Sequence, residues 1–286
     1  MKKQIELNVD RDFSGVFNVL IDFLKQEYKL LFKTLILFAS LPLIVLAIFN
    51  TIYFNGMTQS LTSIFAHRTP GAAPNDVPVM MYLYVFTFIC YFMITGLSFS
   101  YLILYNEKGS GNFTHLDVWY RFVSRIGKMI GFQLIAVVLM IFGFILLIIP
   151  GIYVMIPLVF IMMVALVENK GLGDSLSRCF DIIKNNWWVT FGLVIVVGII
   201  VNILSSVFSL PSAAYIMVSA FFGASSNTQE SGLILPGLFS LIAVFGSYLL
   251  SSVSALLIGI QYYNLVEKKD KLSLFNKVDK LGESNE

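Results

Sequence analysis

Apolar residues follow one another along this chain in long runs that contain almost no charged side chain. Six of these runs approach or exceed the ~20 residues that a helix needs to cross about 30 Å of hydrocarbon. They lack the polar and apolar alternation expected of barrel strands. The pattern predicts six spanning helices, at about 30–53, 79–105, 130–149, 152–167, 188–210 and 238–263.

Three segments that precede pairs of these runs show apolar residues at helical spacing on one face and polar residues on the other. They lie at 11–25, 118–128 and 172–187. Amphipathic helices of this kind are typical of the membrane interface. The first and third align at an offset of 159 residues, which suggests three repeated units of an interfacial helix and a two-helix hairpin. The alternative is that any helix entering a membrane from the cytoplasm favours such a sequence.

The positions of the cations predict which ends of the helices face the cytoplasm. Lys and Arg gather before the first run, in the second and fourth connecting segments and after the last run, and of all 19 only Arg68 lies in another connection. Because cationic residues beside spans stay preferentially on the cytoplasmic side, both termini are predicted to be cytoplasmic.

Composition excludes an ordinary soluble domain. Apolar residues make up 57% of the 286 positions, charged residues only 13%, and the mean hydropathy is +0.82. Soluble domains carry about 25% charged residues. We therefore predict an all-α integral membrane protein of six helices in three hairpins, with a cytoplasmic N-terminal segment (1–29), a membrane domain (30–266) and a cytoplasmic tail (267–286).

The connections between the runs differ in character. Pro150 and Gly151 fall between the third and fourth runs, where they suit a tight turn. Residues 211–222 are too few to span, so we expect a short helix that lies on the outer face or dips back into it. We expect mobile segments at 55–78 and after residue 271.

The ordered set of Pro150–Gly151, a span ending at Glu168-Asn169-Lys170-Gly171, and a helix running from Gly173 to the Asn185-Asn186-Trp187-Trp188 sequence resembles the membrane domain of YciC-like proteins. A related domain precedes some bacterial glycerophosphodiester phosphodiesterases, and the resemblance covers mainly residues 110–265. It implies a six-helix protein of the bacterial plasma (inner) membrane. We expect this chain to lack the phosphodiesterase domain of the fused relatives, together with its metal ligands.

No arrangement of residues typical of catalysis is found. His67 and His115 are predicted on opposite sides of the bilayer, so they cannot share a metal, and no zinc or phosphate-loop spacing occurs. We expect no enzyme activity, cofactor, metal or nucleic-acid partner. Within the runs, Gln133 and Asn202 are candidates for hydrogen bonds between helices, or alternatively for contacts with a substrate.

Two further features are candidate contact sites. Glu168 and Arg178 either form an ion pair or hold a lipid headgroup. In the sixth run, small residues recur every fourth position and form a ridge that permits close helix packing, either within the chain or with a second copy or a partner. The ridge consists of Ala243, Ser247, Ser251, Ala255 and Gly259.

These observations predict a non-enzymatic subunit that scaffolds or assists a larger envelope complex. The alternative is a transporter or lipid-handling protein with a cavity between hairpins. A closed interior favours the first hypothesis, and a cleft that reaches Gln133 or Asn202 favours the second.

Overall fold

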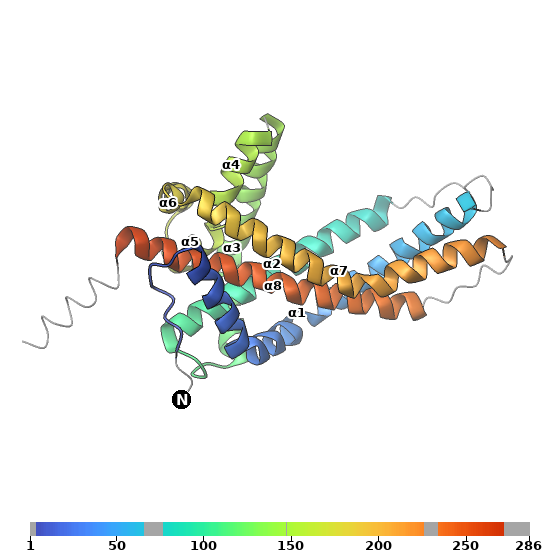
Figure 1. Cartoon of the computed structure of the whole chain (residues 1–286), viewed down its shortest axis with the longest axis horizontal. Helices are drawn as coiled ribbons and strands as arrows, with labels where there is room; N and C mark the ends of the chain where they lie inside the picture. Colours follow the sequence, from blue (N-terminus) through green and yellow to red (C-terminus); the bar gives the residue numbers. More distant parts are fainter. Residues whose placement is uncertain (1–3, 66–76, 147, 226–233, 272–286) are drawn as a thin grey trace, which may run out of the picture. The chain divides into compact units, whose positions relative to one another are not determined.

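The computed structural model describes residues 4–65, 77–146, 148–225 and 234–271, and every regular element in these ranges is an α-helix (Figure 1). The all-helical class predicted from the sequence is thus confirmed. The helices are α1 (Phe13–Phe65), α2 (Val77–Lys108), α3 (His115–Leu146), α4 (Ile148–Leu158), α5 (Ile161–Val167), α6 (Leu172–Ile183), α7 (Trp187–Ser225) and α8 (Ile234–Asp270).

Six stretches of the described residues are long and apolar enough to cross a membrane, which confirms the predicted number of spans. Most of them are much longer than the ~20 residues that a crossing requires. Their bounds are Phe13–Ile64, Pro78–Lys108, His115–Ile145, Ile148–Val167, Trp187–Phe221 and Ile234–Asp270.

The helices extend beyond the predicted bounds because polar segments beside the apolar runs continue the same helix. The amphipathic segments 11–25 and 118–128 pass without a break into α1 and α3, whereas the third forms the separate helix α6. α1 also runs to Phe65, although a loop is predicted from residue 55. There Thr58 and Thr62 each donate to the carbonyl four residues back, so these hydroxyls are satisfied within the helix.

The short outer helix predicted at 211–222 is a wrong prediction, because α7 continues through Pro211 to Ser225. A proline removes one N–H from the helix, but local adjustments tolerate this in apolar surroundings. The other parts of the predicted mobile segments, at 66–76 and 272–286, lie outside the described residues, as do His67 and Arg68.

The chain divides into two compact units. Unit 1 comprises Met1–Thr34, Thr95–Ile199 and Val253–Glu286, and unit 2 comprises Leu35–Ile94 and Ile200–Ser252. α3, α4, α5 and α6 therefore belong wholly to unit 1, whereas α1, α2, α7 and α8 contribute to both.

In unit 1 the fourth candidate span is interrupted between α4 and α5. Pro157 lacks an N–H, so the carbonyl of Tyr153, four residues back, loses its helical partner. The indole N–H of Trp187, at the start of α7, donates to this carbonyl at 3.1 Å, and the Trp187 ring stacks on the Tyr153 ring at 5.5 Å. Pro157, inside α4, thus leaves free the carbonyl to which the first residue of α7 is hydrogen-bonded.

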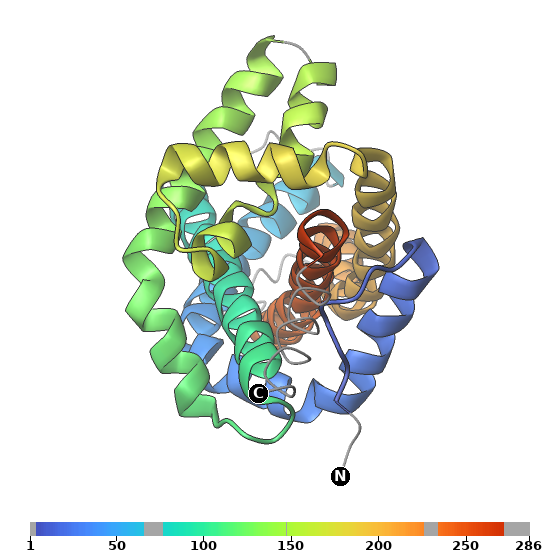
Figure 2. The same cartoon turned by 90° about the vertical axis from the view of Figure 1, so that its left-hand side faces the viewer.

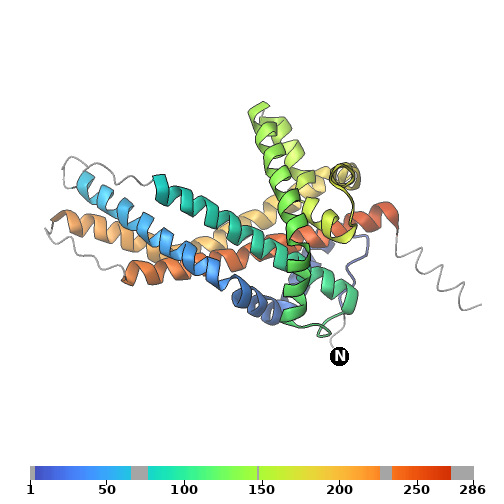
Figure 3. The same ribbon diagram turned by 180° about the vertical axis from the view of Figure 1, so that it is seen from behind.

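The turn predicted at Pro150 and Gly151 is also wrong, since both residues lie in the first turn of α4. Proline suits that position because the first N–H groups of a helix have no helical partner. Gly151 instead permits the close approach of α3 and α4, which lie side by side in Figure 3. A Cβ atom on Gly143 would lie 3.2 Å from the Gly151 Cα, and one on Gly151 would lie 2.8 Å from the Phe144 ring.

Unit 2 is packed mainly through rings and close helix contacts. Phe49 of α1 stacks on Tyr82 and Phe86 of α2, with centroid separations of 5.1 and 5.5 Å. Gly246 of α8 faces the ring of Phe208 on α7, where a Cβ atom would lie only 2.3 Å from the ring. Within this unit, α1 and α2 are therefore joined through apolar surfaces, and so are α7 and α8.

Candidate functional site

A groove of about 430 Å³ lies between α2 and α8 in unit 2. Its lining combines aromatic rings with hydroxyl groups and includes no carboxylate, lysine, arginine or histidine. Ligand pockets commonly have volumes of about 300–1,000 Å³. The lining residues are Tyr84, Thr87, Phe88, Tyr91, Ser247, Tyr248 and Ser251.

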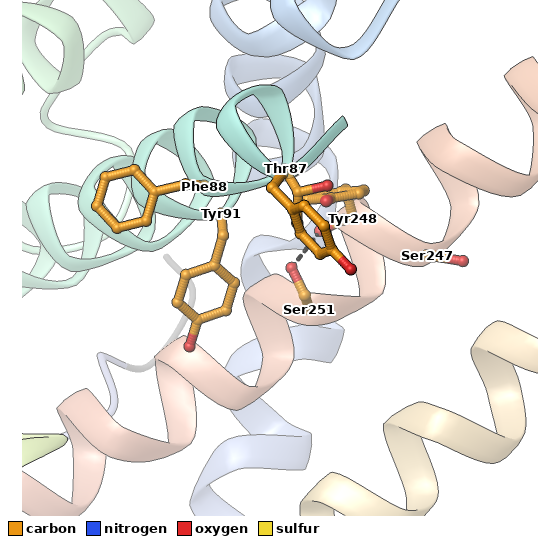
Figure 4. A pocket seen from close by; sticks show the side chains of 7 residues that line it. Thr87, Phe88, Tyr91, Ser247, Tyr248 and Ser251 are labelled. Atoms are coloured by element: carbon orange, nitrogen blue, oxygen red, sulfur yellow. Dashed lines mark hydrogen bonds between the residues drawn. The ribbon is translucent and has the colours of Figure 1, made fainter. Parts of the chain in front are cut away.

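The two walls of this groove have different characters. In Figure 4, Phe88 and Tyr91 project from α2, while Ser247 and Ser251 lie along α8. The rings on α2 are accessible, with Tyr84 75% and Tyr91 48% exposed. The α8 wall offers the small side chains of Ser247 and Ser251 beside the ring of Tyr248, and the Ser251 hydroxyl donates to the backbone carbonyl of Tyr248 at 2.7 Å. The groove thus presents the accessible rings of α2 opposite an α8 wall on which two serines leave room beside one ring.

The structure divides the predicted small-residue ridge between two environments. Ala255 and Gly259 are buried in unit 1, where a Cβ atom on Gly259 would lie 2.4 Å from the Leu102 side chain of α2. This end of the ridge permits packing within the chain. Ser247 and Ser251, in unit 2, line the groove, and Ala243 is partly exposed beside them.

Arg178 of α6 is the centre of an ion cluster in unit 1. Its Nε donates to a carboxylate oxygen of Glu168 at 3.0 Å, and its Nη2 donates to Asp270 near the end of α8. Glu168 also accepts a hydrogen bond from the Tyr262 hydroxyl at 3.0 Å and pairs with Lys170 at 2.6 Å. Of the two predicted alternatives for Glu168 and Arg178, the described contacts are those of an ion pair, with Asp270 as an additional partner.

Burial and pairing act in opposite directions on these charges. Burial alone raises the pKa of the Glu168 carboxyl, but hydrogen bonds from its three partners outweigh this effect and hold the pKa below its ordinary value. Burial likewise disfavours the Arg178 cation, but its bonds to Asp270 and Glu168 raise the pKa above its ordinary value. Both groups are therefore charged at neutral pH, which suits a structural cluster.

A second polar network joins three parts of unit 1. The backbone N–H of Arg11 donates to Asn264 Oδ1 at 2.8 Å, and Asn264 Nδ2 donates to Gln261 Oε1 at 3.0 Å. Gln261 Nε2 in turn donates to Thr190 Oγ1 of α7 at 3.0 Å. Asn264 and Gln261 are almost fully buried. The stretch before α1 consequently lies against the end of α8 (Figure 2).

Glu27 of α1 forms a third polar contact in unit 1. It is 4% exposed and accepts hydrogen bonds from the Tyr101 hydroxyl at 2.6 Å and from the Ser110 hydroxyl at 2.5 Å. Sequence analysis does not identify this carboxylate or the pair of Gln261 and Asn264. The sequence signal that could identify these three residues is a polar side chain on the face of a helix whose other residues are apolar.

The remaining candidate residues do not converge on the groove. Gln133 is partly exposed on α3, Asn202 is exposed on α7, and neither lines the groove. His115 begins α3, and its Nδ1 lies 2.8 Å from Thr34 Oγ1.

Cys90 and Cys179 are buried, free thiols, and burial raises the pKa of Cys179 to about 12. Within the described ranges, no three His, Cys, Asp or Glu residues form a metal-binding group.

Comparison with known proteins adds no relative. No family model, curated protein or solved structure matches this chain. The resemblance to YciC-like membrane domains therefore depends on the quoted residues alone.

Proposed function

We propose that this chain is a non-enzymatic multi-pass membrane protein that scaffolds or assists a larger envelope complex. A transmembrane helix of a partner protein occupies the groove between α2 and α8. The observation that carries this proposal is the pair of small residues Ser247 and Ser251 on the α8 wall, which lies opposite accessible rings on α2.

Helix association in lipid supports this choice of occupant. Lipid tails are as apolar as the helices, so association depends on van der Waals contact and on small residues that let two backbones approach closely. Ser247 and Ser251 provide such a surface, and the ring of Tyr91 provides a large contact area opposite it. In unit 1 the partly buried Arg178 cluster joins α6 to α8, so this unit has specific internal contacts.

The proposed location is the bacterial plasma membrane, with both termini in the cytoplasm. The distribution of cations in the sequence supports the orientation, because cytoplasmic flanks of spans are enriched in Lys and Arg. The resemblance to YciC-like domains supports the type of membrane.

The test is the replacement of Ser251 by Leu, which fills the groove beside the α8 wall. Ser206→Leu is the matched control, because Ser206 is exposed on the unit 2 part of α7 and does not line the groove. Both variants are purified in mild detergent beside the unsubstituted chain. We expect a partner membrane protein to copurify with the unsubstituted chain and with Ser206→Leu but to be lost from Ser251→Leu.

A photo-crosslinking amino acid identifies what the groove contacts. Placed at Tyr84, it is expected to join the chain to an apolar segment of the same partner, whereas placed at Ile203 of α7 it is not. Unchanged copurification of the partner with Ser251→Leu would contradict the proposal.

The groove also favours a second function, because its volume and apolar rings suit an acyl chain. A lipid-handling protein or transporter would then be the better description. In that case the crosslinker at Tyr84 would join the chain to phospholipid and to no protein. The phospholipid that copurifies with the unsubstituted chain would be lost from Ser251→Leu.

A further inference from the structure

Two cations of α3 meet at one neutral oxygen in unit 1. Arg125 Nη1 donates to Asn169 Oδ1 at 2.8 Å, and Lys128 Nζ donates to the same atom at 3.0 Å. The cations are three residues apart and so share one face of the helix. Asn169 follows α5 with a positive φ of 53°, a conformation that asparagine tolerates better than most residues.

The charges of these cations are not offset, unlike those of their neighbours. Arg121, one helical turn earlier on α3, makes two hydrogen bonds to the Glu107 carboxylate, at 2.8 and 3.2 Å. Among the described residues, the ion pairs within 4.0 Å include neither Arg125 nor Lys128. The nearest carboxylate in sequence to Asn169 is Glu168, which is already paired with Lys170 and Arg178.

The place of this pair along α3 fits the boundary of an apolar layer. Both cations precede the apolar run that begins at Ile130, and Lys128 Nζ lies 5.6 Å from the centre of the Phe132 ring. Cationic side chains beside a span place their charged ends at the level of the headgroups while their stems cover apolar surface.

We propose that Arg125, Lys128 and Asn169 form a binding site for a phosphate group, carried either by an anionic phospholipid headgroup or by free inorganic phosphate. The guanidinium and ammonium groups donate to the phosphate oxygens, which replace Asn169 Oδ1 as their shared acceptor. The Asn169 side chain turns so that its NH₂ group donates to the same phosphate. The site is independent of the partner groove in unit 2.

The experiment measures binding of dioctanoyl phosphatidylglycerol, dioctanoyl phosphatidylcholine and inorganic phosphate to the full chain in a neutral detergent, by native mass spectrometry and by isothermal titration. We expect phosphatidylglycerol to bind and its affinity to fall about tenfold or more in Arg125→Gln/Lys128→Gln, because two charge-assisted hydrogen bonds are lost. Lys29→Gln/Lys33→Gln removes the same charge from α1 and is expected to bind as the unsubstituted chain does.

A single substitution separates binding from folding. Asn169→Asp places a carboxylate between the two cations, and aspartate also tolerates the left-handed conformation. We expect this variant to lose phosphate binding and to unfold at a higher temperature than the unsubstituted chain. A loss of folding therefore does not explain its loss of binding.

The ligands distinguish the sources of the phosphate. Binding of phosphatidylglycerol without inorganic phosphate assigns the site to lipid headgroups, whereas comparable binding of inorganic phosphate assigns it to the free anion. The proposal is overturned if neither ligand binds, if phosphatidylcholine binds as tightly as phosphatidylglycerol, or if the α1 control loses as much affinity as the α3 variant.

Discussion

In unit 1 the polar side chains bond across large separations in sequence, whereas many hydroxyl groups of unit 2 bond to their own helix. Arg11 and Asn264, which are 253 residues apart, are joined directly in unit 1. In unit 2, Thr51, Thr58 and Ser252 each donate to a carbonyl three or four residues back. The first kind of bond fixes which segments are neighbours, and the second only satisfies a hydroxyl where it stands.

This difference bears on how each unit responds to change. Side-chain networks that join distant segments specify one arrangement, because each donor needs its particular acceptor. Apolar surfaces such as the Phe208 ring against Gly246 accept several packings of similar volume. Unit 2, which holds the open groove, is therefore better suited to adapt to an occupant, and unit 1 to hold a fixed arrangement.

The largest expected effect comes from removing the centre of the unit 1 ion cluster. Arg178→Ala leaves Glu168 and Asp270 without their shared guanidinium, and we expect the unfolding free energy to fall by about 2–3 kcal/mol, because the ion pairs are partly buried and two carboxylates lose a partner. Unfolding in mixed detergent micelles, followed by tryptophan fluorescence, measures this change.

The control for that variant is an exposed ion pair of the same unit. Lys25 and Asp22 lie 3.9 Å apart and are mostly exposed, so Lys25→Ala is expected to cost less than about 1 kcal/mol. Equal losses in the two variants would show that the cluster is no more than a surface charge pair.

A smaller effect is expected at the helix break of unit 1. Trp187→Phe keeps an aromatic ring but leaves the Tyr153 carbonyl without its donor, which costs about 1–2 kcal/mol. Pro157→Ala supplies a helical N–H to that carbonyl. In the Pro157→Ala background, Trp187→Phe should therefore cost clearly less, and the double-mutant cycle measured by thermal unfolding gives the coupling. Additive losses would mean that the contribution of Trp187 does not depend on the carbonyl that Pro157 leaves free.

The smallest effects provide the most direct comparison between the units, because the same substitution is made in each. Thr190→Val in unit 1 removes the acceptor of the buried Gln261 amide, and we expect a loss of about 1–2 kcal/mol. Thr51→Val in unit 2 removes only a bond to the Ala47 carbonyl of its own helix, and a change below about 0.5 kcal/mol is expected. Chemical unfolding of both variants checks this, and the reverse order would contradict the contrast between the units.

Sequence patterns identify the helices better than their partners. The six spans follow from apolar length, which is a local property. Pro150 is misplaced in a turn because proline suits both a turn and the first turn of a helix. The hydrogen bond from Trp187 to Tyr153 is predictable only in part. Pro157 has no N–H, so the sequence indicates that the Tyr153 carbonyl lacks its helical donor, but it does not indicate which residue donates instead.

The candidate site is predicted only in part for the same reason. The small-residue ridge marks the face of α8 that packs closely, and both Gly259 and Ser251 belong to it. Only the tertiary structure shows that α2 packs against the ridge at Gly259, whereas at Ser251 the ridge lines the groove. The convergence of Arg125 and Lys128 on Asn169 depends equally on how α3 and the end of α5 come together.

The bond between Arg11 and Asn264 has a consequence for biosynthesis. Ribosomes make the N-terminal segment first, at about 5–20 residues per second, so its acceptor on α8 emerges at least about ten seconds later. During that interval the residues before α1 lack their partner on α8, although Tyr105 of α2, which is made earlier, can already accept the hydrogen bond from the Ile5 N–H. Their closure onto α8 is then a late event that reports completion of the membrane bundle.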